Sequence, residues 1–272
     1  MTSMEGRNVE TAERWCRDVF EGDLDLLDKV FTYPYVLHSP RGTVSQGPES
    51  RRAAVAAAMS NNPGLRWQID DIVARGDKVA CCLTAMQPST ESSELEPTTT
   101  WLEIHRLLNG RIAETWVCWR DAAVGPWQGE SVPHERWSIA FSETLTPNEE
   151  ANLATLNRWG DIRHNRSNDF DALPRLVADR LILHGPVQTQ TLTVPDVLRV
   201  AAGFAERYSG FAAKYDDVFV VGDRAAARFC YRFPEPSPER GSLQCGIGVY
   251  RFEDHRIAEY WQANLPNDVD WT

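Results

Sequence analysis

The sequence predicts an α+β protein made of two tandem, cone-shaped domains, each with three helices packed on a curved, mostly antiparallel sheet. The first observation is an internal repeat: RIAETW at residues 111–116 returns as RIAEYW at residues 256–261. Residues 24–40 also align without a gap with residues 170–186. The second observation is that each half has apolar residues at helical spacing, followed by four strand-like segments. Each half is therefore expected to fold in the order ααβαββββ.

In the first half, the ends of the helices are marked by particular residues. Gly22 is expected to end the first helix, and Asp23 is placed to cap a short second helix. Pro48 begins an alanine-rich third helix. The expected elements are helices at residues 8–21 and 24–31, a strand at 35–40, a polar turn at 41–42, a helix at 48–59, strands at 66–76, 77–87, 98–108 and 111–120, and a long exposed hairpin loop at 89–97.

A connecting segment is expected between the two halves. Residues 123–146 carry no clear period, and they separate a first domain of residues 1–122 from a second domain of residues 147–272. A chain of 272 residues is long enough for two domains of about 130 residues each. The segment contains Trp127 and Trp137, which suggest that it packs on a domain.

The second half repeats the plan of the first. Thr146, Pro147 and Glu149 form the pattern of a capped helix start, with proline at the first position and a capping-box glutamate. This helix is expected to run through Trp159. A short helix near residues 171–177, a strand ending in HGP, a helix at residues 195–208 and four strands are expected to follow.

Composition and charge exclude several classes of protein. The net charge of −11 offers no basic stripe for a phosphate backbone, so no nucleic-acid partner is expected. No apolar run approaches the roughly 20 residues that cross a bilayer, and the N-terminus lacks the layout of a signal peptide. These features predict a cytoplasmic protein without a membrane partner. The six cysteines show no C-x-x-C spacing and are expected to be reduced thiols.

Several of these motifs together resemble a known family. The first helix, the GDLD turn at residues 22–25, the strand end HSP or HGP and the closing R-I-A-E-x-W strand resemble the SnoaL-like polyketide cyclases. This family lies in the ketosteroid isomerase and nuclear transport factor 2-like superfamily. The resemblance implies a blind pocket in each cone. It also implies that the two halves pair as a pseudo-dimer within one chain, as single-domain relatives pair as dimers.

The same resemblance suggests a cofactor-independent acid/base enzyme. Such an enzyme would cyclise, isomerise, dehydrate or open an epoxide on a small apolar, polyketide- or terpenoid-like substrate. No G-x-S-x-G elbow, P-loop or H-E-x-x-H motif is present, and the histidines lack ligand spacing, so neither a cofactor nor a metal is expected. The rival interpretations are a non-catalytic module that binds a small molecule and a protein-interaction scaffold.

His38 and His184 are the leading candidates for a catalytic base. Each ends a strand and could point into its cone, near the position where the resembled isomerases carry a catalytic aspartate. A histidine can transfer a proton near neutral pH without a large pKa shift. The alternative is a structural histidine that holds the strand end in place.

Glu103 and His105 lie two residues apart and so share one face of a predicted strand. The repeat has Gly248 and Tyr250 at these positions, so an acidic pocket is expected only in the first half. Either residue could instead face solvent. Asp121 is the fifth catalytic candidate. It follows the closing strand that contains Trp116, and the resembled SnoaL-like cyclases have an acid/base aspartate shortly after that tryptophan. The first half is therefore expected to catalyse, and the second to bind, to cap or to supply a surface for a second partner.

Aromatic and amide side chains are the candidates for substrate contact. Trp15 and Trp159 lie where the resembled isomerases have an oxyanion-stabilising tyrosine, but an indole can only donate one hydrogen bond, and a core role is the alternative. Glu114 with Trp116, and Glu259 with Trp261, are interpreted as structural pairs, with the tryptophan as pocket wall. The candidates are Trp15, Tyr35, Trp67, Trp101, Trp116, Trp119, Trp159, Tyr231, Tyr250, Trp261 and Asn264.

Overall fold

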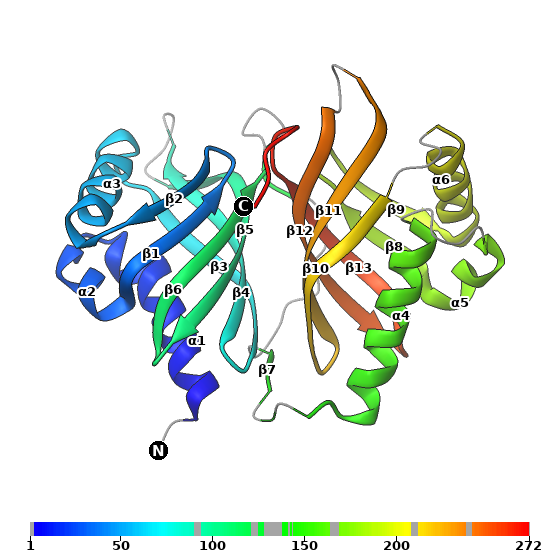
Figure 1. Cartoon of the computed structure of the whole chain (residues 1–272), viewed down its shortest axis with the longest axis horizontal. Helices are drawn as coiled ribbons and strands as arrows, with labels where there is room; N and C mark the ends of the chain where they lie inside the picture. The colour runs from blue at the N-terminus through cyan, green and yellow to red at the C-terminus, as the bar shows by residue number, and fades with distance from the viewer. Residues whose placement is uncertain are drawn as a thin grey trace. The chain divides into compact units, whose positions relative to one another are not determined.

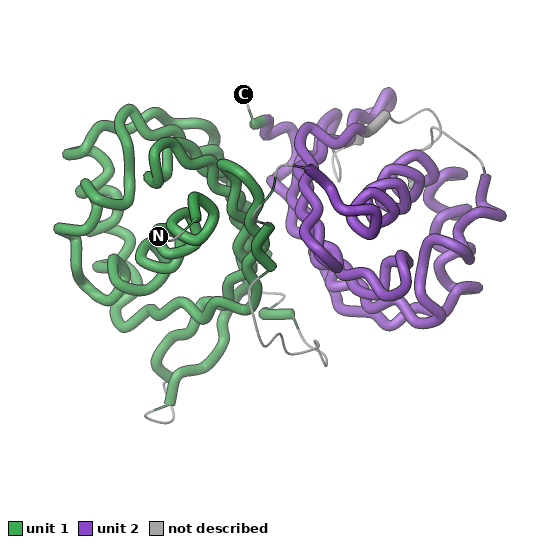
Figure 2. Tube along the Cα trace, turned by 90° about the horizontal axis from the view of Figure 1, so that it is seen from below, with its two compact units in different colours: residues 1–143, 271–272 green, residues 144–270 purple. Residues whose placement is uncertain are grey.

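The chain divides into two compact units, Met1–Glu143 with Trp271–Thr272 and Thr144–Asp270 (Figure 2). Each unit has one sheet and its own helices, so the predicted α+β fold is confirmed for both halves (Figure 1). In unit 1, the chain of the sheet curves around the first helix. The computed structural model describes residues 3–89, 94–120, 125–127, 138–140, 142, 144–163, 169–207, 212–237 and 241–271.

The first helix of unit 1 starts earlier than expected. Helix α1 (Met4–Arg14) is capped by Ser3, whose Oγ accepts a hydrogen bond from the Gly6 backbone N–H at 3.0 Å. It continues directly into a π-helical turn (Trp15–Val19). The elements that follow are a 3₁₀ turn (Leu24–Leu26), α2 (Leu27–Val30), β1 (Phe31–Ser39), β2 (Gly42–Gln46), α3 (Pro48–Asn61), β3 (Arg66–Arg75), β4 (Lys78–Pro88), β5 (Leu95–Leu108), β6 (Arg111–Trp119) and β7 (Ser138–Ala140).

The sheet of unit 1 has the order β2-β1-β6-β5-β4-β3-β7. Only the β1–β6 and β3–β7 pairs are parallel, so the sheet is mostly antiparallel as predicted. The edge strands β2 and β7 were not predicted. Because β7 belongs to the connecting segment and pairs with β3, this part of the segment packs on a domain, as expected. The Trp127 backbone N–H also donates to Oγ of Thr100 at 3.0 Å, whereas Trp137 lies outside the described residues.

Unit 2 repeats this plan. The predicted capping box is present at the start of α4 (Pro147–Arg163), where the backbone N–H and hydroxyl of Thr146 both donate to Oε2 of Glu149. The sheet order is β10-β11-β12-β13-β8-β9, with β13 and β8 parallel. The remaining elements are a 3₁₀ turn (Phe170–Ala172), α5 (Leu173–Leu176), β8 (Val177–His184), β9 (Thr189–Thr193), α6 (Val194–Arg207), β10 (Ala212–Val221), β11 (Arg224–Ser237), β12 (Gly241–Glu253) and β13 (Arg256–Asn264).

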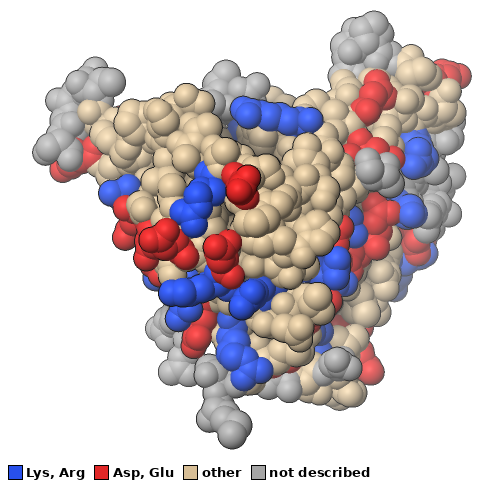
Figure 3. Space-filling view, turned by 60° about the vertical axis from the view of Figure 1, so that its left-hand side comes forward, with Lys and Arg blue, Asp and Glu red and all other residues tan. Residues whose placement is uncertain are grey.

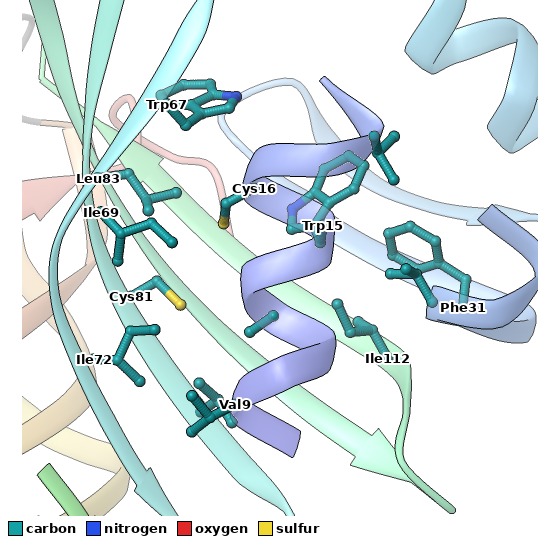
Figure 4. Close-up of a cluster of buried hydrophobic side chains, with 14 of the residues drawn as sticks. Val9, Trp15, Cys16, Phe31, Trp67, Ile69, Ile72, Cys81, Leu83 and Ile112 are labelled. Atoms are coloured by element: carbon teal, nitrogen blue, oxygen red, sulfur yellow. The ribbon is translucent and has the colours of Figure 1, made fainter. Parts of the chain in front are cut away.

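The two faces of each sheet differ in what packs on them. We call the face that packs on the helices of its own unit the inner face, and the opposite one the outer face. In unit 1, Ile72 and Cys81 project from the strands toward Val9 and Trp15 of the first helix (Figure 4). Side chains alternate between faces along a strand, and residues paired across neighbouring strands share a face. The strand pairing therefore determines whether a strand side chain lies on the inner or the outer face of its sheet.

One pair of cysteines differs from the expectation that all six are reduced thiols. Cys230 on β11 and Cys245 on β12 are paired across the two strands and joined by a disulfide. Among the described residues, these two and Asp270 form one cluster of metal-ligand type, but the disulfide occupies both sulfurs. The other cysteines are buried thiols outside this disulfide: Cys16, Cys81, Cys82 and Cys118.

Titration with a thiol reagent in denaturant is expected to find four thiols without reductant and six after reduction. The native protein should react far more slowly, because burial keeps the four thiols outside the disulfide away from the reagent. The Cys230→Ser/Cys245→Ser double variant is the control and should give four thiols under both denaturing conditions. Six thiols in the unreduced wild type would contradict the disulfide.

None of the helices within the described part of the chain is long and apolar enough to cross a membrane. On the face shown in Figure 3, basic and acidic side chains are interspersed, and neither sign forms a continuous stripe. The expected absence of a nucleic-acid partner and the pairing of the two halves as a pseudo-dimer stay predictions.

Candidate acid/base site in the first domain

Glu103 and His105 lie side by side on the inner face of unit 1. Strand pairing places Glu103 beside Cys81 and His105 beside Val79, and both partners belong to the cluster that packs on α1. Glu103 is 5% exposed and His105 is fully buried. Nε2 of His105 lies 3.2 Å from Oε2 of Glu103, close enough for charge pairing although not aligned as a hydrogen bond. Neither side chain faces solvent.

Trp15 also holds the carboxylate of Glu103, through the same oxygen that lies next to His105. Its Nε1–H donates to Oε2 of Glu103 at 3.3 Å. Trp15 is the first residue of the π-helical turn, a local widening of the helix that often occurs at functional sites. No described side chain bonds Oε1 of Glu103, which leaves this oxygen able to take a proton from a ligand.

His105 is held in a fixed orientation by Thr115 on the neighbouring strand. Its Nδ1 lies 2.9 Å from the Thr115 hydroxyl. Burial lowers the pKa of His105, but the neighbouring Cys81 thiol and Glu103 carboxylate raise it by more, to about 9. The contact with Cys16 and burial raise the pKa of Cys81 well above its usual range, so it stays a thiol. His105 is therefore an imidazolium at neutral pH, beside a carboxylate.

This pKa predicts a dependence of stability on pH. The pKa of His105 falls from about 9 in the folded state to about 6.5 on unfolding. The folded state therefore binds the proton more tightly. The stabilisation is fully present below pH 6.5 and is lost as the pH rises through 9. We expect the free energy of unfolding to fall by about 3 kcal/mol over this range.

Urea unfolding of the wild type at pH 6, 7.5 and 9.5 measures this effect. His105→Gln should remove most of the decrease. The matched control is His255→Asn, which replaces a histidine at an exposed turn and should keep the wild-type pH dependence. A similar decrease in wild type and His105→Gln would contradict the raised pKa.

Aromatic side chains continue the inner face beyond Glu103. The Trp101 and Trp119 rings stack at 4.6 Å, and Trp67 packs edge-on against Trp101 at 4.8 Å. The Phe20 ring in turn contacts Trp67. Nε1–H of Trp101 is buried without an acceptor among the described residues, so it is a donor available to a ligand. These predicted substrate contacts therefore share the face that carries the acid/base pair.

Arg51 is a site residue that the sequence reasoning missed. It lies on α3 and is 5% exposed, with its Cζ 4.6 Å from the ring centroids of Trp15, Phe31 and Tyr35. Tyr35, a predicted substrate contact, is buried there, and its hydroxyl contacts Thr115. The available signal was an arginine one helical turn before Val55, on the face where α3 buries its apolar residues.

The expectation that His38 and His184 point into the cones is wrong. Tyr35 and Leu37 on β1 pack on the helices, so His38 points to the outer face. There, His38 stacks on Trp116 at 5.2 Å. His184 stacks in the same way on Trp261 at 5.2 Å. Because Trp116 and Trp261 share this face, they do not line the inner face either.

On the outer face, each histidine belongs to a hydrogen-bonded network. His38 lies 2.8 Å from both the Thr43 hydroxyl and Oε1 of Glu114. The other oxygen of Glu114 accepts from Nε of Arg106 at 2.8 Å. This confirms the interpretation of Glu114 as a structural residue bound to neighbouring strands. The same network recurs in unit 2 with His184, Thr189, Glu259 and Arg251.

The inner face of unit 2 lacks the acid/base pair. Tyr250 stacks on Tyr260 at 4.4 Å, and a Cβ added to Gly248 would lie 2.8 Å from the Tyr260 ring. The tyrosine rings therefore occupy the space that Glu103 fills in unit 1. Trp159, Tyr231 and Tyr250 are buried on this face, where Nε2 of Gln262 donates to Oδ1 of Asn264 at 2.8 Å.

Of the five candidate proton carriers, the structure brings together Glu103 and His105. His38 and His184 lie on the outer faces. Asp121 lies outside the described residues. The repeat does not preserve this pair, since it has Gly248 and Tyr250 at the positions of Glu103 and His105. The outer-face network is therefore common to both halves, whereas the acid/base pair lies on the inner face of unit 1.

Comparisons with known proteins identify the family. The sequence model of the SnoaL-like domain matches residues 12–115 and 162–260. An NTF2-like protein of unknown function from Mesorhizobium loti is 21% identical, with a TM-score of 0.38, over 44% of this chain and 96% of its own. A candidate SnoaL-like polyketide cyclase from Jannaschia sp. CCS1 is 20% identical, with a TM-score of 0.38, over 44% of this chain and 90% of its own.

A third solved structure, wild-type IdmH, a candidate polyketide cyclase from Streptomyces antibioticus, is 25% identical, with a TM-score of 0.34, over 41% of this chain and 91% of its own. No curated protein matches the chain. The family match covers most of both halves and agrees with the resemblance found in the sequence motifs. The chain therefore belongs to the SnoaL-like domain family and carries one such domain in each half.

Proposed function

We propose that unit 1 is a cofactor-independent acid/base enzyme of the cyclase or isomerase type, acting on a small apolar metabolite of polyketide or terpenoid character. The observation that carries this proposal is the buried pair of Glu103 and His105 on the inner face. A carboxylate beside an imidazolium supplies a base and an acid at once. The aromatic residues on the same face suit a flat, apolar substrate.

In this proposal, Oε1 of Glu103 removes a proton from carbon next to a carbonyl group, and Trp15 keeps the carboxylate in place through Oε2. His105 delivers a proton to the oxygen or carbon where negative charge develops. Cyclisation, isomerisation, dehydration and epoxide opening can each be assisted by a general base and a general acid. Unit 2, with tyrosines in place of the pair, binds a ligand, caps or supplies a surface for a second partner.

Deuterium exchange tests the proposed chemistry without the natural substrate. The full chain is incubated in D₂O with 2-tetralone, a flat bicyclic ketone, and exchange at the carbons next to the carbonyl is followed by NMR. The wild type should exchange these protons faster than the Glu103→Gln/His105→Gln double variant. Equal rates, together with binding of the ketone to both proteins, would favour the alternative function as a non-catalytic small-molecule-binding module.

A further inference from the structure

Arg51 places a positive charge inside the apolar core of unit 1. The guanidinium lies 4.6 Å from each of three ring centroids, those of Trp15, Phe31 and Tyr35, and the residue is 5% exposed. Cation–π contacts with three rings offset part of the cost of removing this charge from water. They supply no opposite charge, however, and buried arginines are almost always paired with an anion.

Arg51 has no such anion among the described residues. Its Nη1 contacts the neutral amide oxygen of Gln46 at 3.4 Å, a long hydrogen bond. Its Nε–H is buried without any acceptor in the described part of the chain. No described carboxylate pairs with the guanidinium. A buried cation with an unused donor is a feature expected of a binding site for an anion.

The fold itself does not require this charge. Arg51 and Val55 are the buried residues of α3, and the corresponding buried residues of α6 in unit 2 are Val197 and Ala201, also four apart. The same helix position is thus apolar in the second copy of the domain. The internal repeat therefore shows that a hydrophobic residue suffices for packing at this position, and that the arginine is special to unit 1.

Two of the rings around Arg51 lead directly to the acid/base pair. Trp15 donates its indole N–H to Glu103 at 3.3 Å. The Tyr35 hydroxyl contacts Thr115, whose own hydroxyl lies 2.9 Å from Nδ1 of His105. An anionic group bound to Arg51 would therefore lie one side chain away from each member of the pair.

From this arrangement, we infer that unit 1 binds a flat aromatic carboxylic acid, whose carboxylate pairs with Arg51. A planar guanidinium can bind both oxygens of a carboxylate, and the carboxylate supplies the missing negative charge. The ligand body would lie along the rings that share this face, among them Trp101 and Trp67. The inference deepens the proposed function and rests on it in treating this face as the substrate site.

Calorimetric titration with two matched probes tests the inference on the full chain. 2-Naphthoate carries the carboxylate, and 2-naphthamide has nearly the same shape without the charge. Wild-type protein is expected to bind 2-naphthoate about tenfold more tightly than 2-naphthamide at pH 7.5. One naphthoate should bind per chain, because unit 2 has Val197 at the helix position of Arg51.

Substitutions on α3 assign this preference to one side chain. Arg51→Gln should abolish the preference for naphthoate, whereas Arg51→Lys should keep part of it, because lysine retains the charge without the planar stacking. The matched control is Arg52→Gln, which makes the same change at the next residue. Arg52 is partly exposed and paired with Asp25 at 3.3 Å, so this variant should keep the full preference.

The comparison of the two probes in wild-type protein needs no variant, so the test holds even if Arg51→Gln fails to fold. Equal affinities of the wild type for both probes, no binding of either probe, or a preference that persists in Arg51→Gln would each overturn the inference. Failure of the proposed function is recognised separately. If 2-tetralone exchange is the same in wild type and the Glu103→Gln/His105→Gln variant while the naphthoate preference holds, the site binds acids without catalysing.

Discussion

Replacing Glu103 with glutamine is expected to lower kcat/KM by about 10²–10⁴-fold, the usual contribution of a positioned general base. The amide keeps the size of the side chain and can still accept the hydrogen bond from Trp15, which lies 3.3 Å from Oε2. It cannot take up a proton. The loss should therefore appear in kcat, with a smaller change in KM. Steady-state kinetics on any ketone that the wild type exchanges or isomerises gives both constants.

His105 should control the alkaline side of the pH profile. Because the pKa of His105 is about 9, its protonated form is present at neutral pH and acts as the acid. The value of kcat/KM should therefore fall as the pH rises through 9. His105→Gln should lower the rate and remove this decrease.

The matched control for Glu103 is Glu96→Gln, an exposed glutamate on the same strand, which should leave the kinetics unchanged. Comparable losses in Glu96→Gln and Glu103→Gln would contradict the assignment of the base.

The internal repeat allowed much of the fold to be predicted from the sequence. Helix α3 was found through Pro48 and the alanines after it, and α4 through the capping pattern around Thr146. The edge strands β2 and β7 were missed for a physical reason. GTVSQ and SIA are too short to show a period, and they are strands only because β1 and β3 offer them hydrogen-bonding edges.

The inner site was harder to predict because a strand's period defines two faces without saying which one is buried against the helices. For His38 a signal was nevertheless present. Phe31, Tyr35 and Leu37 alternate with it and form the more apolar set, which favours the inner face. The repetition of histidine in both halves was compatible with a catalytic or a structural role, and both copies belong to matching outer-face networks. The two halves differ instead at positions such as Glu103, where the repeat has Gly248.

The outer-face network makes a second strong prediction: Glu259→Gln should lower the free energy of unfolding by about 3 kcal/mol. The Glu259 side chain is fully buried and lies between two basic side chains. Its Oε1 is 2.8 Å from Nε2 of His184, and its Oε2 is 3.0 Å from Nε of Arg251. Glutamine removes the buried negative charge between His184 and Arg251, and breaking a buried pair costs about 3–5 kcal/mol. Glu253 still pairs with Nη1 of Arg251 at 2.5 Å, so the expected loss lies at the lower end of this range.

Unit 1 provides the matched control through the repeat. Glu114 makes the same contacts with His38 and Arg106, but its side chain is 18% exposed and the Arg106 side chain is 42% exposed. Water can therefore solvate the charges left in Glu114→Gln, and the loss should be about 1 kcal/mol. Urea unfolding of both variants, followed by circular dichroism, measures the difference. Equal losses would mean that burial does not set the strength of the network, and unchanged deuterium exchange in both would support its purely structural role.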